Sequence, residues 1–382
     1  MVTQQTTTKQ TNKALRIRGG VSPKRGSLER FETEAAASPA QRTSNIARVF
    51  RYHGGPIITS PQVYTSFWGS LWGTDPRYQT FARHLNQFHT DLLQSGFMNV
   101  LSQYGVGSGA FVGATFVNSV PDVLTDKSIQ GIIQSSIAAG MLPEPSNPSN
   151  IALIIYLDEH IGINDPADNL VLCMPTSDVA FGYHNSFTTA AGNPFYYAVI
   201  PALADACLHE SCSDDAQCSL HLSENQEQRM TQVASHEFAE MTTDPEGNGW
   251  YAPDPLGENG DICNGETDTL VVGANSWTVQ KIYSKYDDRR SRGAVHCVGQ
   301  APQPLPRLLQ APVASRLRQA SSYEQLLPLP ARYFDASANI VSIDEQQTQE
   351  YVLELFTRLG TEGIVTDVPG FLRQAADVLA KR

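Results

Sequence analysis

The sequence predicts an α/β fold in which helices flank a mixed β-sheet, and three segments carry this prediction. Residues 151–157 (IALIIYL) form a continuous apolar run whose seven-residue length favours a strand buried on both faces. Residues 75–94 begin with an Asp-Pro cap and then repeat apolar residues at helical spacing. Residues 195–201 (FYYAVIP) are rich in aromatic and β-branched residues, as in a core strand.

The other elements follow from similar local signals. Residues 48–53 and 57–69 combine β-branched and aromatic residues with Gly/Pro turns, and residues 105–118 alternate, so each predicts a strand. Residues 125–140 repeat isoleucines at helical spacing, and a capping-box pattern at 223–226 opens a second helix that runs to about Met241. Residues 268–284 predict a hairpin with its turn at 273–276.

The composition divides the chain into four parts. Residues 1–45 are poor in large apolar side chains and predict a flexible leader. Residues 46–299 carry the α/β pattern, and residues 300–343 are rich in proline, as in a linker. Residues 344–382 contain two amphipathic patterns, which predict a two-helix C-terminal appendage. Such a small appendage packs on the main domain or on a partner, so we expect self-association or partner docking there.

The overall charge argues against nucleic acid as a partner. The 382 residues include 27 Lys and Arg against 39 Asp and Glu, which gives a net charge of −12. No apolar stretch is long enough to span a membrane, and the N-terminus has no segment of signal-peptide type. Taken literally, the missing signal sequence leaves a cytoplasmic location open.

The six cysteines point the other way. Cys207, Cys212 and Cys218 cluster in a polar stretch, and Cys173, Cys263 and Cys297 are dispersed. An even count in a loop-rich chain favours disulfides, with free thiols and a zinc knuckle as alternatives. The spacings of the clustered cysteines do not match the usual knuckle.

The chemistry of the chain concentrates in residues 235–263. In SHEFAEMTTDP, His236 and Glu240 are four residues apart and therefore share one face of a helix. Glu237 lies beside His236, where a general base stands in the zinc-peptidase motif that has His at both ends of this spacing. Here Glu240 replaces the second His, so the sequence predicts a zincin-like helix with a carboxylate-rich ligand set.

A catalytic zinc ion needs three protein ligands and an open position, so a third ligand must come from elsewhere. Asp261 in the sequence GENGDIC is the first choice, Glu258 and Asp244 follow, and His184 is possible from the neighbouring strand end. Glu237 is then the general base, and His184 or Tyr251 steadies the oxyanion. We expect Zn²⁺, with Ca²⁺ or Mn²⁺ as alternatives because the set is rich in oxygen. The competing interpretation is a metal-free hydrogen-bond pair of His236 and Glu240.

Three stretches resemble the EXORDIUM (phosphate-induced protein) family over about residues 48–298. They are His53–Thr59 with the following Val63–Tyr64 and Phe67–Gly69, then Asp178–His184 with Phe195–Ala198, and then Thr243–Tyr251 with Cys263. The resemblance implies a secreted, growth-related protein without an assigned reaction. The HExxE string is similar to that of metallopeptidases and indicates a microbial branch of the family.

Three hypotheses of function follow. The first is a metal-dependent peptidase that acts on a peptide or protein substrate. The second is a non-catalytic extracellular binding protein of EXORDIUM type. The third is a structural domain that calcium stabilises.

Overall fold

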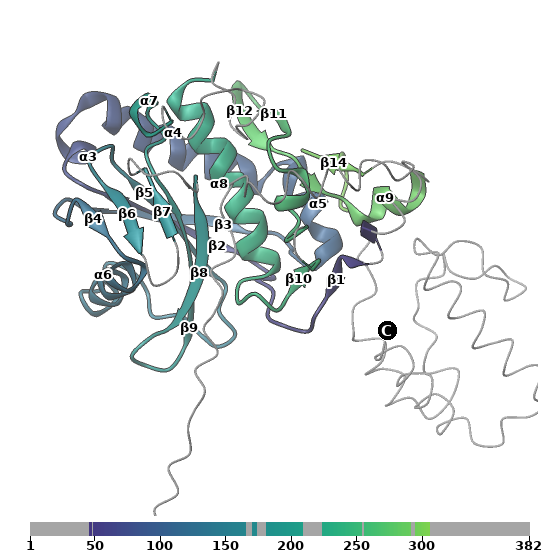
Figure 1. The fold of residues 1–382 in the computed structure, drawn as a ribbon, viewed down its shortest axis with the longest axis horizontal. Helices are drawn as coiled ribbons and strands as arrows, with labels where there is room; N and C mark the ends of the chain where they lie inside the picture. The colour runs from purple at the N-terminus through teal and green to yellow at the C-terminus, as the bar shows by residue number, and fades with distance from the viewer. Residues whose placement is uncertain are drawn as a thin grey trace, which may run out of the picture.

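A five-stranded sheet forms the centre of the protein (Figure 1). The computed structural model describes residues 46–47, 49–165, 170–173, 181–208, 224–253, 256–291 and 295–305. The strand order is β3-β2-β5-β9-β8, in which the first four strands run parallel and β8 is antiparallel to β9. The bounds are β2 Gln62–Trp68, β3 Ala110–Val117, β5 Ile151–Leu157, β8 Tyr183–Thr188 and β9 Pro194–Ile200. The predicted mixed α/β fold is confirmed.

The alternation of side chains along β5 divides the hydrophobic core into two parts. Every residue of β5 is buried, as its continuous apolar run predicts. Ala152, Ile154 and Tyr156 face a core that includes residues of α4, α5 and α8. The intervening residues, such as Leu153 and Ile155, face a second core that contains α6 and residues of β6 and β7. Helical layers therefore cover both faces of the sheet.

The helices begin where the sequence provides caps. In α4 (Pro76–Leu93), the Asp75 side chain accepts from the backbone N–H of Arg77, and Pro76 fills the first helical position. In α6 (Asp126–Ala138), Thr125 forms a capping box with Ser128. Both helices match the predicted ranges. Figure 1 shows α6 on the opposite side of the sheet from α8.

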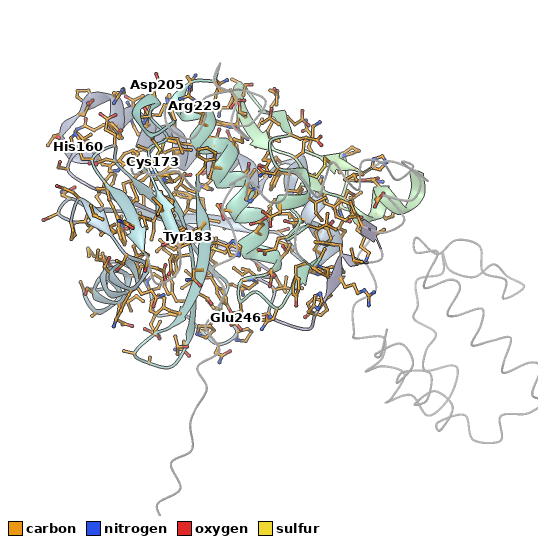
Figure 2. The ribbon with its side chains drawn as sticks, in the orientation of Figure 1. His160, Cys173, Tyr183, Asp205, Arg229 and Glu246 are labelled. Carbon is orange, nitrogen blue, oxygen red and sulfur yellow. A yellow bond between two sulfur atoms is a disulfide. The ribbon has the colours of Figure 1, made fainter. Side chains whose placement is uncertain are left out.

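Helix α8 (Gln226–Thr243) carries the residues singled out in the sequence. Its capping box joins Asn225 and Gln228, two residues later than the expected start at Ser223, which lies outside the described residues. Arg229 near the start of α8 and Glu246 just after its end lie toward opposite ends of the domain (Figure 2). Arg229 and the rest of the helix through Thr243 are buried, although many of these residues are polar. A polar helix buried on all sides calls for a specific explanation.

A hairpin covers the side of α8 that faces away from the sheet. It consists of β11 Thr267–Val272 and β12 Asn275–Gln280, in agreement with the predicted turn. The remaining short helices are α3 Leu71–Thr74, α5 Gly96–Leu101, η1 Ser102–Tyr104, α7 Asp205–Leu208, η2 Asp261–Cys263 and α9 Lys285–Ser291. The remaining short strands are β1 Arg51–Tyr52, β4 Val123–Leu124, β6 Gly162–Asp165, β7 Leu170–Leu172, β10 Trp250–Tyr251, β13 Ile282–Tyr283 and β14 Cys297–Val298.

The described chain ends on α5. Ala301 donates its backbone N–H to Gly96 and Leu305 donates to Asn99, so residues 300–305 pack on the α/β unit. The predicted leader at 1–45 and the two-helix appendage at 344–382 lie outside the described residues, as does all of the expected linker beyond residue 305. Within the described part, no helix is both long and apolar enough to cross a membrane.

Candidate metal centre

The first group of potential ligands contains His236, Glu240 and Asp261. One ligand atom from each lies within 4.8 Å of the others. His236 Nε2 is 3.1 Å from Glu240 Oε1 and 3.9 Å from Asp261 Oδ1. Donor atoms on a tetrahedral zinc ion are separated by about 3.4 Å, given zinc–ligand distances of about 2.1 Å. The group therefore has the dimensions of a three-ligand zinc site.

A second group shares one member with the first. Ligand atoms of His184, Glu240 and Glu258 also lie within 4.8 Å of one another. His184 is the second residue of β8. Its Nδ1 lies 3.7 Å from Glu240 Oε2, and its Nε2 lies 3.7 Å from Glu258 Oε1. Glu240 thus directs its two carboxylate oxygens toward different imidazoles.

The other predicted site residues occupy different positions. Glu237 is fully buried, and its Oε2 is 3.4 Å from His184 Nδ1. Asp244 is buried at the end of α8 and belongs to neither group of ligands, and its Oδ1 accepts a hydrogen bond from the Gly249 backbone N–H. Tyr251 lies on β10 and stacks on His53. The structure therefore brings Glu237 into the cluster, whereas Tyr251 contacts His53 and pairs with Arg51 of β1.

Several buried polar atoms in the cluster lack a hydrogen-bond partner among the described residues. They are His236 Nε2, Glu237 Oε1, Glu240 Oε2 and both carboxylate oxygens of Glu258. Each of these side chains has no exposed surface. Burying a polar group without a partner costs about 1–3 kcal/mol, and more for a charged group. A cation bound among them would remove this cost.

Burial and the concentration of negative charge raise three carboxyl pKa values. Burial, together with the charge of Glu240, holds the pKa of Glu258 well above its usual range. Burial and Glu240 also raise the pKa of Asp261 to about 7. Burial raises the pKa of Glu237, although a hydrogen bond from His184 opposes the shift.

The two imidazoles balance part of this charge. Burial lowers the pKa of His236, but the charge and hydrogen bond of Glu240 together with the charges of Glu237 and Asp261 raise it to about 10. Burial also lowers the pKa of His184, but its contact with Glu237 and the charges of Glu240 and Asp244 together raise it above the ordinary value. Burial raises the pKa of Glu240, but its contacts with His236, His184 and the Asp261 backbone N–H together lower it below the ordinary value. Without an ion, the cluster is therefore a network that shares protons.

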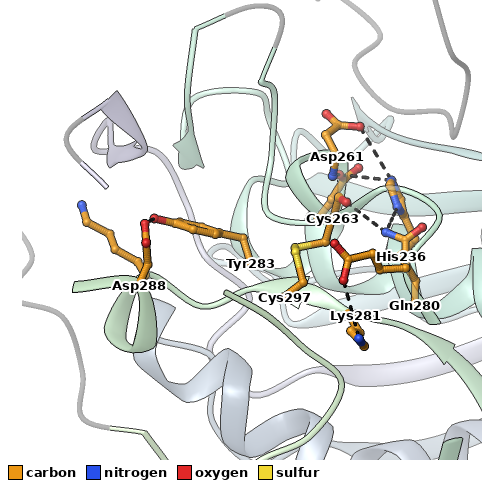
Figure 3. Close-up of a disulfide and its surroundings, with 12 residues drawn as sticks. His236, Asp261, Cys263, Gln280, Lys281, Tyr283, Asp288 and Cys297 are labelled. Carbon is orange, nitrogen blue, oxygen red and sulfur yellow. Dashed lines mark hydrogen bonds and ion pairs between the residues drawn. A yellow bond between two sulfur atoms is a disulfide. The ribbon is translucent and has the colours of Figure 1, made fainter. Parts of the chain in front are cut away.

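Gln280 is a site residue that the sequence did not reveal. Its Nε2 lies 2.6 Å from His236 Nδ1 and donates to the carbonyl of Gly260 at 2.9 Å. The register of the β11–β12 hairpin places Gln280 over α8, where its backbone N–H donates to Ser235 Oγ. No motif in the sequence marks a glutamine at the end of a hairpin strand. Figure 3 shows Gln280 and Asp261 beside the His236 ring.

The loop that supplies Glu258 and Asp261 is held close to α8. Asp261 donates its backbone N–H to Glu240 Oε1, and its Oδ2 accepts from the backbone N–H of Glu258. Gly260 allows this approach, because a Cβ there would lie 2.8 Å from Glu240 Oε1 and 2.9 Å from His236 Nδ1. Two residues after Asp261, the Cys263–Cys297 disulfide fixes η2 to β14 (Figure 3).

Four of the six cysteines lie in the described part of the chain and form two disulfides. Cys173 pairs with Cys207, and Cys263 pairs with Cys297. The first pair excludes Cys207 from the zinc knuckle considered as an alternative. Cys212 and Cys218 lie outside the described residues. Disulfides are typical of oxidising compartments, so both pairs are compatible with an extracellular protein.

Asp158 directly follows β5 and makes structural hydrogen bonds. Its Oδ2 accepts from the backbone N–H of Leu71 and its Oδ1 from that of His160, so the side chain closes two turns. The candidate centre lies between α8, β8 and the loop at 257–263.

The chain is similar to a plant protein of the family that the sequence motifs resemble. It is 24% identical over 281 residues to Protein EXORDIUM-like 3 of Arabidopsis thaliana. The aligned region covers 65% of this chain and 77% of the relative. No family model and no solved structure matches the chain. The similarity is distant and supports a relationship to the EXORDIUM family.

Proposed function

We propose that this protein is an extracellular, metal-dependent hydrolase of peptidase type, with the ion held by His236, Glu240 and Asp261. The observation that carries the proposal is the convergence of these three side chains from two segments, with Glu237 adjacent on the same helix. His236 Nε2 lacks an aligned hydrogen-bond partner among the described residues, as expected of an atom that donates its lone pair to an ion.

The donor set fits zinc best. One imidazole nitrogen and two carboxylates leave a fourth tetrahedral position open, which is typical of catalytic rather than structural zinc sites. Manganese also accepts this mixture, whereas calcium prefers ligand sets made only of oxygen. When bound, the ion supplies Lewis acidity toward a carbonyl oxygen and toward water.

Glu237 is the proposed general base. Its Oε2 faces His184 at 3.4 Å, which fixes the carboxylate, and its Oε1 has no partner among the described residues. Burial raises its pKa, which suits a group that takes up a proton and returns it to a leaving amine. We assign His184 a positioning role through Glu237, and stabilisation of the oxyanion by His184 stays a prediction.

Solvent and substrate would reach the cluster most easily from the side where Asp261 lies. The side chain of Asp261 is 25% exposed, whereas those of His236 and Glu240 are fully buried. A peptide substrate would therefore approach along the loop at 257–263.

Complete burial also favours a second candidate function, a structural ion that stabilises the fold. Glu237 has no exposed surface, so a substrate would have to pass the loop at 257–263 to reach it. A structural ion needs no such access. In that case the protein would be a non-catalytic domain of the EXORDIUM type, with calcium as one choice of ion.

The Glu237→Gln variant separates the two candidates. If the protein is a hydrolase, this variant retains its zinc by elemental analysis but no longer cleaves a library of unstructured peptides. Glu227→Gln is the matched control, because Glu227 lies on the same helix and pairs with exposed His84. The control keeps full activity. Zinc-loaded wild-type protein that cleaves no peptide, or a Glu237→Gln variant as active as wild type, would contradict the hydrolase.

A further inference from the structure

We propose that the cluster binds two metal ions, bridged by the carboxylate of Glu240. The second ion lies between His184, Glu240 and Glu258. This proposal rests on the proposed metal site and extends it from one ion to two.

The orientation of Glu240 supports a bridge. Oε1 is 3.1 Å from His236 Nε2 in the first group, and Glu240 also belongs to the second group, whose ligand atoms lie within 4.8 Å of one another. The Asp261 backbone N–H occupies one lone pair of Oε1 and leaves another available. Hydrolases with two metals hold their ions about 3.5–4 Å apart, a separation that one carboxylate can span.

Glu258 has no role in a site with a single ion. It is fully buried, and neither carboxylate oxygen has a hydrogen-bond partner among the described residues. The nearest cationic group among these residues is His184, whose Nε2 lies 3.7 Å from Oε1. A buried carboxylate without hydrogen-bond partners, beside an imidazole, has the environment of a ligand to a cation.

The balance of charge also favours two ions. Glu237, Glu240, Glu258 and Asp261 form a cluster in which no ion pair to Lys or Arg occurs among the described residues. One divalent ion compensates two of these carboxylates, and a second compensates the other two.

His184 is oriented for this role. Its Nδ1 faces Glu237 Oε2 at 3.4 Å while Nε2 faces Glu258. A carboxylate that accepts one ring N–H fixes the tautomer and leaves the opposite nitrogen for the ion. Glu237 therefore orients His184 with one oxygen and keeps the other free.

Titration of the metal-free, full-length protein with Mn²⁺ tests the proposal. Bound manganese is counted by equilibrium dialysis, and electron paramagnetic resonance reports whether the ions interact. We expect two ions per chain with the spectrum of an exchange-coupled pair. Glu258→Gln should bind one ion with the spectrum of isolated Mn²⁺, and Glu227→Gln should bind two.

The outcomes distinguish this proposal from the proposed function. One uncoupled ion per wild-type chain would overturn the bridge and leave the hydrolase proposal intact. No bound manganese or zinc would overturn both. If Glu258→Gln does not fold, the coupling in the wild-type spectrum decides alone.

Discussion

Replacing Gln280 with leucine tests whether His236 is a metal ligand. Gln280 is fully buried and reaches both His236 Nδ1 and the Gly260 carbonyl. When an ion binds Nε2, the ring proton of His236 must be on Nδ1. The Gln280 side-chain oxygen, which has no hydrogen-bond partner among the described residues, can then turn toward Nδ1 and accept this proton. Leucine cannot accept this hydrogen bond, and the ring loses its orientation.

The expected loss follows from the cost of removing a partner that orients a metal-bound histidine. Such losses are about 10–100-fold in metal affinity, or about 1.4–2.7 kcal/mol. Competition with a fluorescent zinc chelator measures the affinity. Gln280→Glu restores much of it, because a carboxylate accepts the Nδ1 proton.

Gln103→Leu is the matched control for this substitution. Gln103 is equally buried, and its side chain bonds the Val100 carbonyl and Ser284 Oγ away from the cluster. Both leucine variants should lose about 1–3 kcal/mol of stability. Only Gln280→Leu should lose zinc affinity. Equal affinities in wild type and Gln280→Leu, or an equal loss in Gln103→Leu, would show that Gln280 does not orient a metal-bound His236.

Two further predictions concern protons and space in the cluster. In the metal-free protein, folding raises the pKa of His236 from 6.5 to about 10 and the pKa of Asp261 from 3.8 to about 7. Each group therefore holds more protons in the folded state than in the unfolded state over the interval between its two pKa values. Thermal stability of the metal-free protein should therefore fall from pH 5 to pH 9 and recover when zinc displaces the protons, and a rise without metal would contradict this. Gly260→Ala places a Cβ 2.8 Å from Glu240 Oε1, so it should weaken zinc binding at least about tenfold through displaced ligands. Gly131→Ala is the control, because a Cβ at Gly131 would have no other atom within 4 Å. It should leave zinc affinity unchanged and raise stability by about 0.5–1 kcal/mol. A similar loss of zinc affinity in both variants would exclude a local effect of Gly260.

The sequence predicts the fold best where the signal is local. The apolar run of β5 and the caps of α4 and α6 depend on neighbours in the chain, and these elements lie where the sequence places them. The start of α8 is displaced by two residues, because Asn225 and Gln228 form the capping box.

The candidate site is predictable only in part. Helical spacing identifies His236 and Glu240 as neighbours, and the acidic loop suggests Asp261. Gln280 depends on the register of a hairpin that packs on α8, and the pairing of His184 with Glu258 depends on contacts between distant segments. Such tertiary contacts leave no periodic signal in the chain.

Anomalous diffraction at the zinc absorption edge, from crystals grown with zinc, locates an ion bound between α8 and the loop at 257–263. We expect a peak about 2.0–2.2 Å from His236 Nε2 and from carboxylate oxygens of Glu240 and Asp261. Zinc found only on exposed side chains, with no peak between α8 and the loop at 257–263, would contradict this expectation.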